Sequence, residues 1–105
     1  MTIPTSMKAV EITEVGEPSV LQLCEAPLPE LGAEDVLIKV HAAGVNRPDC
    51  MQRRGHYNVP EDASIYPGLE VSGEVVARGS AVNQWQLGSR VVALTHGGGY
   101  AEYCK

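Results

Sequence analysis

The chain has 105 residues, of which 44% are hydrophobic, so it can build the core of one domain but not of two. Eight lysines and arginines against thirteen aspartates and glutamates give a formal net charge of −5. Nucleic acids and anionic membranes attract clustered positive charge, so neither is an expected partner. The three cysteines lack CxxC spacing, which indicates reduced thiols rather than a disulfide framework.

The first part of the chain predicts a short leader and a pair of strands. Residues 1–6 indicate a mobile leader without the basic and apolar regions of a signal peptide, so we expect a cytoplasmic protein. Residues 7–13 predict a strand that ends before a glycine–proline turn. Residues 20–26 predict a second strand, in which Leu21 and Leu23 alternate with polar neighbours and should face the core.

The clearest strand signal is followed by a change to a helical pattern. Residues 36–45 predict the strand, with every second residue from Val36 to Val40 on one face. Pro48 near the start and Gly55 past the end then predict a short helix over residues 49–54.

Three arginines, Arg47, Arg53 and Arg54, form the one basic cluster of the sequence. Two adjacent arginines favour a solvated helix end, and a phosphate-binding role is the alternative.

The remaining chain predicts three further strands, over residues 68–77, 90–95 and 100–104, separated by glycine-rich turns. Gly73 lies inside the first of them, which indicates a bulge or the close approach of another backbone. The pattern favours a mainly β fold, a partly open antiparallel barrel with one short helix. Because the chain stops inside an apolar edge strand, we expect it to be part of a larger protein.

Four motifs occur in a fixed order: N-R-x-D-x-x-Q-R-x-G-x-Y from Asn46, P-G-x-E-x-x-G-x-V-x-x-x-G from Pro67, G-x-R-V-x-x-L from Gly88, and G-G-Y-A-E-Y from Gly98. Together they resemble the medium-chain dehydrogenase/reductase superfamily and, within it, the zeta-crystallin-like quinone oxidoreductases. The resemblance implies that residues 7–105 are a GroES-like catalytic domain, cut off before a Rossmann nucleotide-binding domain. It also implies a parent enzyme that is a homodimer.

The zinc ligands of this superfamily are missing from the sequence. The zinc alcohol dehydrogenases of this superfamily carry a metal-binding Cys where this chain has Asn46, and a metal-binding His where it has Leu69. Neither residue is a good zinc ligand, and the four-cysteine lobe for structural zinc is missing too. We therefore expect no zinc. Hydride transfer from NADPH to a conjugated carbonyl, such as a quinone or an enone, remains feasible without a metal.

Three residues are the candidates for the site. Asn46 could be catalytic, holding a substrate carbonyl or placing the nicotinamide, or it could only satisfy backbone at the helix start. Asp49 could be catalytic by orienting Asn46 or Arg53, or it could only complement the helix dipole. Tyr57 matches a tyrosine that borders the cofactor and substrate cleft in the family, although it could merely cover the core.

Other polar residues are expected to have structural roles. Tyr66 should pack, and Glu70 should pair with an arginine or accept backbone hydrogen bonds. His41, His56 and His96 occur singly, as surface or loop histidines do. No phosphate-binding glycine motif is present, so the chain alone should bind NADPH poorly.

Two alternatives to quinone reduction stay open at this point. The substrate could be an enoyl thioester or another enone, or the chain could be a non-catalytic GroES-like binding module.

Overall fold

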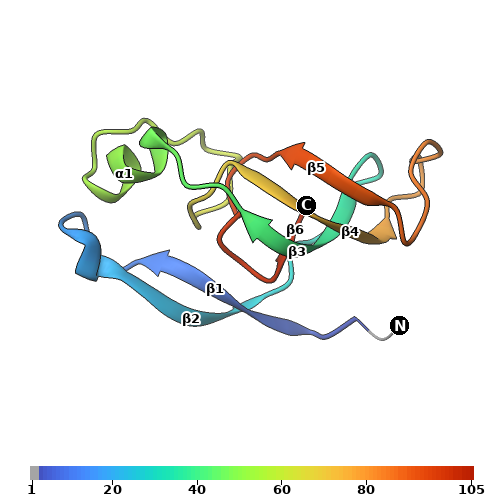
Figure 1. Cartoon of the computed structure of the whole chain (residues 1–105), viewed down its shortest axis with the longest axis horizontal. Coiled ribbons are helices and arrows are strands. Elements are labelled where there is room, and N and C mark those ends of the chain that lie inside the picture. Colours follow the sequence, from blue (N-terminus) through green and yellow to red (C-terminus); the bar gives the residue numbers. More distant parts are fainter. Residues whose placement is uncertain (1–2) are drawn as a thin grey trace.

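The computed structural model describes residues 3–105, and this part of the chain forms six strands, one α-helix and one 3-10 turn (Figure 1). The elements are β1 (Ser6–Ile12), η1 (Pro18–Val20), β2 (Leu21–Pro27), β3 (Val36–Ala43), α1 (Arg47–Arg53), β4 (Glu70–Arg78), β5 (Arg90–Leu94) and β6 (Tyr103–Cys104). The prediction of a mainly β fold with one short helix is confirmed. Residues 1 and 2 of the expected leader lie outside the described residues.

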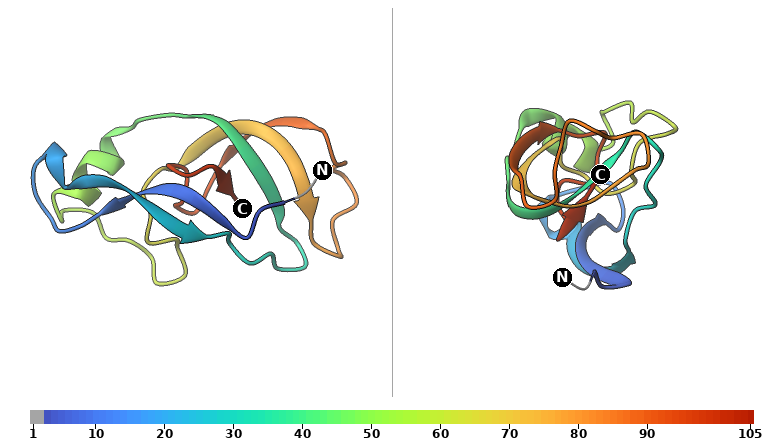
Figure 2. Two further views of the ribbon diagram at one scale, coloured as in Figure 1. Left: turned by 90° about the horizontal axis from the view of Figure 1, so that it is seen from below. Right: turned by 90° about the vertical axis from the view of Figure 1, so that its right-hand side faces the viewer.

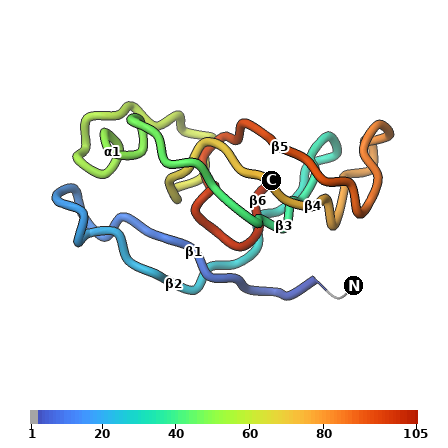
Figure 3. The backbone as a smooth tube through the Cα atoms, in the orientation of Figure 1, coloured from blue at the N-terminus to red at the C-terminus, as the bar shows by residue number. Residues whose placement is uncertain are grey.

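The strands form two antiparallel sheets, the hairpin β1-β2 and a four-stranded sheet in the order β5-β4-β3-β6. The hairpin lies along one side of the larger sheet, as the trace in Figure 3 and the end-on view in Figure 2 show. Backbone hydrogen bonds from Val10 N to Tyr100 O (2.8 Å) and from Glu102 N to Lys8 O (3.0 Å) join the last segment of the chain to β1. These contacts make the partly open barrel.

The prediction of one strand over residues 100–104 is wrong in its extent. Residues 100–102 bond to β1, whereas Tyr103 and Cys104 pair with β3. The partner changes at Glu102, whose N–H donates to Lys8 O of β1 and whose carbonyl accepts from Val40 N of β3 (2.8 Å), and only the last two residues form β6.

Strand β3 follows the predicted alternation, and it is buried on both faces at Leu37 and Ile38. Leu37 and Ile38 are adjacent, yet they are only 3% and 2% exposed. Because successive side chains of a strand point to opposite faces, Leu37 packs into one core cluster, whereas Ile38 packs into the other. One cluster contains Met7, Ala9, Ala26, Leu37 and Tyr103, and the other contains Ile38, Val71 and Cys104.

The predicted orientation of β2 is also wrong. Leu23 is 75% exposed, whereas Cys24 packs against the first core cluster and Ala26 belongs to it. The pairing with β1 decides the face, because Cys24 lies opposite Ala9 and Ala26 lies opposite Met7, both buried residues of β1.

Gly73 in β4 lies against the backbone of β3, as the sequence predicted. A Cβ atom at this position would collide with the carbonyl oxygen of Lys39 and would lie 2.8 Å from Cγ2 of Ile38. The register also shifts here, between Val40 and Ala42 of β3. Glycine therefore allows β3 and β4 to meet closely just before β3 reaches Asn46.

Replacing Gly73 by alanine should lower the free energy of unfolding by about 2 kcal/mol, because the strands must separate to admit the methyl group. Urea unfolding followed by circular dichroism would measure the change. Gly32→Ala is the matched control, since a Cβ there would meet only the movable side chain of Asp35, at 3.0 Å. Equal stability of the two variants would contradict the close approach.

Candidate functional site

The end of β3 leads directly to Asn46, the N-cap residue of α1. Asn46 has the extended backbone of a cap (φ −128°, ψ 164°), and Asp49 occupies the third helical position. The backbone N–H of Asn46 donates to Oδ2 of Asp49 (2.9 Å), and Asp49 N donates to Asn46 O (3.0 Å). This capping arrangement explains why α1 begins at Arg47, two residues earlier than predicted. Asn46 itself remains half-exposed.

Asp49 is buried, with 5% of its surface exposed. The same oxygen, Oδ2, also accepts a hydrogen bond from the hydroxyl of Tyr100 (2.7 Å), a residue 51 positions away in the sequence. The second carboxylate oxygen, Oδ1, is buried and has no partner among the described residues. Asp49 therefore connects the start of α1 to the glycine-rich segment before β6.

Burial, and then the hydrogen bond to Asp49, raise the pKa of the Tyr100 hydroxyl above its ordinary value. The phenol therefore keeps its proton at neutral pH and acts as the donor to the carboxylate.

Glycines place Tyr100 against Asp49. Gly99 N donates to Gly68 O (3.1 Å), and Tyr100 N donates to Pro67 O (3.0 Å). Gly68 has a left-handed backbone (φ +103°), and a Cβ atom there would lie 2.6 Å from Tyr100 N. Only glycine allows the two segments to approach in this way. Three of the motifs that are separated in the sequence therefore meet around Asp49 and Tyr100.

The positions matching the two zinc ligands of the alcohol dehydrogenases lie at one end of the β3-β4 pair. Gly44 N donates to Glu70 O (3.2 Å), which continues the antiparallel pairing towards Asn46 on one side and Leu69 on the other. Within residues 3–105, no three His, Cys, Asp or Glu side chains gather in a group that could hold a metal ion.

Tyr57 follows α1 in a loop and is half-exposed. No hydrogen bond joins Tyr57 to Asn46, Asp49 or Tyr100 in the described part of the chain. The role of Tyr57 in the site therefore stays a prediction. Glu70 is exposed and forms no ion pair with an arginine in the described chain, unlike one of its expected roles.

The prediction of a solvated arginine pair is wrong for Arg53. Its side chain is 5% exposed, and Nη1 donates to the carbonyl oxygen of Gly16 (2.6 Å) in the turn between β1 and β2. Gly16 N in turn donates to Arg53 O (2.9 Å). The guanidinium therefore anchors α1 to the hairpin and is not free to bind a phosphate group. Its neighbour Arg54 is exposed, as predicted.

The expectation that the histidines lie on the surface is confirmed, since His41, His56 and His96 are all exposed. His96 pairs with Asp62, with 2.8 Å between Nε2 and Oδ1. The hydrogen bond from His96 lowers the pKa of the Asp62 carboxyl.

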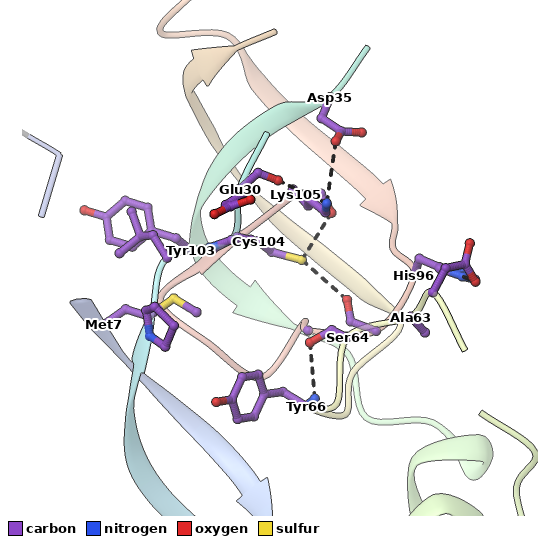
Figure 4. Close-up of a pocket in the computed structure, with 16 residues that line it drawn as sticks. Met7, Glu30, Asp35, Ala63, Ser64, Tyr66, His96, Tyr103, Cys104 and Lys105 are labelled. Atoms are coloured by element: carbon purple, nitrogen blue, oxygen red, sulfur yellow. Dashed lines mark hydrogen bonds and ion pairs between the residues drawn. The ribbon is translucent and has the colours of Figure 1, made fainter. Parts of the chain in front are cut away.

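A cavity of about 620 Å³ lies beside this pair, between loop 62–66 and the end of the chain (Figure 4). Tyr66 and Tyr103 line it, and Tyr66 also packs against the first core cluster, as predicted. None of the residues lining this cavity is a predicted site residue.

A second cavity, a groove of about 570 Å³, borders Gly44 and therefore lies next to Asn46 along the chain. Its lining is mostly apolar and includes Val92 and Leu94, which are 83% and 87% exposed.

Comparison with known proteins identifies the family. The model described as the alcohol dehydrogenase GroES-like domain matches residues 32–105. The chain belongs to the alcohol dehydrogenase GroES-like domain family. Quinone oxidoreductase from Lama guanicoe is 42% identical to this GroES-like domain over 101 residues, which cover 92% of the chain and 30% of that protein. The chain therefore spans about a third of the length of its relatives.

Solved structures agree with this assignment and confirm the GroES-like fold. A quinone oxidoreductase from Coxiella burnetii superimposes with a TM-score of 0.84 at 36% identity, covering 94% of this chain and 34% of that one. A mycobacterial relative complexed with NADPH has a TM-score of 0.80 at 38% identity, covering 93% and 30% of the two chains. The CurK enoyl reductase has a TM-score of 0.79 at 25% identity, covering 95% and 32%.

Sequence reasoning missed Tyr100 as a residue of the site. It stands in the motif G-G-Y-A-E-Y, which supported the resemblance but suggested no role for the side chain.

Within residues 3–105, no helix has the length and apolar character needed to cross a membrane.

The anchor between α1 and the hairpin gives a test of the fold around the site. Arg53→Ala should lower the free energy of unfolding by roughly 2 kcal/mol, because the partly buried carbonyl of Gly16 loses a charged donor. Thermal unfolding would measure this. Arg54→Ala, a change of the adjacent exposed arginine, should alter stability by less than about 0.5 kcal/mol. If the two variants are equally stable, the anchor contributes nothing.

Proposed function

We propose that this GroES-like domain is the catalytic-domain portion of a zinc-independent, NADPH-dependent quinone oxidoreductase. The observation that carries the proposal is the placement of Asn46. It is half-exposed at the end of β3, its backbone is held by Asp49, and an apolar groove begins two residues earlier at Gly44. The similarity to quinone oxidoreductases over nearly the whole chain supports it.

The residues around Asn46 suit the uncharged end of a nicotinamide cofactor better than its phosphates. An amide offers both a donor and an acceptor, and the groove is mostly apolar. Of the three arginines in the basic cluster, Arg53 is buried against Gly16, whereas Arg47 and Arg54 are exposed. We infer that Asn46 and Tyr57 would contact the nicotinamide and the acceptor, while phosphate binding belongs to a separate nucleotide-binding domain. When bound, the cofactor supplies the hydride for reduction.

Asn46 would act on the acceptor through its side-chain amide. A quinone oxygen gains negative charge as its ring accepts a hydride, and an N–H donor fixed in place stabilises that charge without moving. Asp49 contributes by holding the backbone of Asn46, and Tyr57 would border the acceptor with its ring. The absence of cysteine and histidine at positions 46 and 69 supports a reaction without zinc.

Reduction of an enoyl thioester or another enone is the second candidate function. It uses the same hydride chemistry, and the fold of the CurK enoyl reductase, with its TM-score of 0.79, favours it as the alternative. The parent protein is proposed to be a cytoplasmic homodimer whose partners are small molecules.

The full-length protein should oxidise NADPH in the presence of an ortho-quinone, followed by absorbance. Asn46→Ala should lower kcat/KM by about 10- to 100-fold, because the acceptor oxygen loses its donor. Asn83→Ala is the matched control, since Asn83 is exposed in the turn before β5. Reduction of enoyl thioesters but not of quinones would favour the alternative, and activity unaffected by Asn46→Ala would contradict the role of this residue.

The 105-residue chain alone should show no saturable binding of NADPH in titration calorimetry. It has no phosphate-binding glycine motif, and Arg53 is committed to Gly16. Micromolar affinity for this chain would mean that it contains a complete cofactor site, contrary to the proposal.

A further inference from the structure

The hydroxyl of Tyr100 in the glycine-rich segment donates a hydrogen bond to Asp49, the carboxylate that holds the backbone of Asn46. We propose that Tyr100 is a positioning residue, whose hydrogen bond to Asp49 fixes the turn that presents Asn46 to the acceptor. The proposal rests on the proposed function for its consequence in catalysis, but the structural link can be tested without it.

The geometry around Asp49 makes the bond difficult to replace. A single oxygen, Oδ2, accepts from both Tyr100 Oη (2.7 Å) and Asn46 N (2.9 Å), so the tyrosine determines how the carboxylate meets the turn. The other oxygen, Oδ1, has no described partner that could hold the carboxylate in its place. The carboxylate is also buried, so water cannot readily take over from the phenol.

The backbone of Tyr100 is held in place by two hydrogen bonds, so its side chain can fix the position of Asp49. Its backbone N–H donates to Pro67 O (3.0 Å), and its carbonyl accepts from Val10 N of β1 (2.8 Å). Its backbone is thus fixed by β1 and by the segment just before β4. Through the hydroxyl, these parts of the barrel determine the position of the start of α1.

The protonation state of the phenol supports this role. Burial and the neighbouring carboxylate raise the pKa of Tyr100, so the hydroxyl remains a donor throughout the neutral range. A tyrosinate would repel Asp49 instead of holding it.

A positioning role differs from a merely structural role in what it does to kinetics. Small displacements of a group that contacts the reacting atoms reduce the chemical step, whereas loss of general stability reduces the amount of folded enzyme. An interaction that matters in the transition state lowers kcat and kcat/KM together and leaves KM unchanged.

The test uses Tyr100→Phe in the full-length protein, which removes one oxygen atom and keeps the ring. We expect kcat for quinone reduction to fall about tenfold, with KM changed less than about twofold. Tyr103→Phe is the matched control, because it removes the same atom from a tyrosine of the first core cluster that forms no hydrogen bond to Asp49. It should leave kcat within about twofold of the parent value. Equal effects of the two variants, or an unchanged kcat for Tyr100→Phe, would overturn the proposal.

A double-mutant cycle then tests whether Tyr100 acts through Asp49. In an Asp49→Asn background, Tyr100→Phe should reduce kcat by less than about twofold further, because the pair acts as one unit. A further tenfold loss would show that Tyr100 acts by another route.

A third measurement requires neither a variant nor catalysis. In the 105-residue chain, NMR should detect a slowly exchanging Tyr100 hydroxyl proton with a nuclear Overhauser contact to the backbone amide proton of Asn46. Rapid exchange of this proton would overturn the link itself. If the proton is protected but the full-length protein reduces no quinone, the proposed function fails and the link stands.

Discussion

Two hydrogen bonds to one carboxylate oxygen hold the candidate site together. Asp49 Oδ2 accepts from the backbone at the start of α1 and from the hydroxyl of Tyr100, while the carboxylate is shielded from water. Hydrogen bonds to a charged group contribute about 1.5–3 kcal/mol each, more than most single contacts on a protein surface. A buried carboxylate that loses its hydrogen-bond donors is energetically costly. The segments that meet at Asp49 therefore have little freedom to move apart.

Close packing of the strands brings the segments around Asp49 together. Gly73 lets β4 lie against β3 immediately before β3 leads to Asn46, and Gly68 lets the segment with Tyr100 cross close to the start of β4. Arg53 then ties the far end of α1 to the turn of the hairpin. The short helix is thus held at both ends by other parts of the fold. A helix of seven residues has little stability of its own, so these contacts decide where it lies.

Much of the fold could be predicted because it follows local rules. Alternation, glycine turns and proline positions predicted the strands and the helix, and Gly73 was correctly interpreted as a close approach of strands. The errors arise where partners far away in the sequence decide the outcome. Leu23 is exposed because the pairing of β2 with β1 directs Cys24 inward, and the last strand is shorter than predicted because Glu102 changes its partner from β1 to β3.

The site shows the same division. Asn46 and Asp49 are three residues apart in the sequence, and their relation at the helix start could be predicted from that spacing. The contact between Asp49 and Tyr100 spans 51 positions, and no periodic pattern signals it. The burial of Arg53 was missed for a similar reason, since adjacent arginines usually lie in water and the partner, Gly16, is 37 positions away.

The central claim is that Asn46, held in place by Asp49, faces the atoms that react. A crystal structure of the full-length protein with NADPH and a quinone would test it most directly. The account predicts that the Asn46 amide lies within about 3.2 Å of a quinone oxygen or the nicotinamide carboxamide, while Asp49 still accepts from Tyr100. A quinone and nicotinamide bound in contact with each other but away from Asn46, for example in the cavity beside Tyr66, would contradict it.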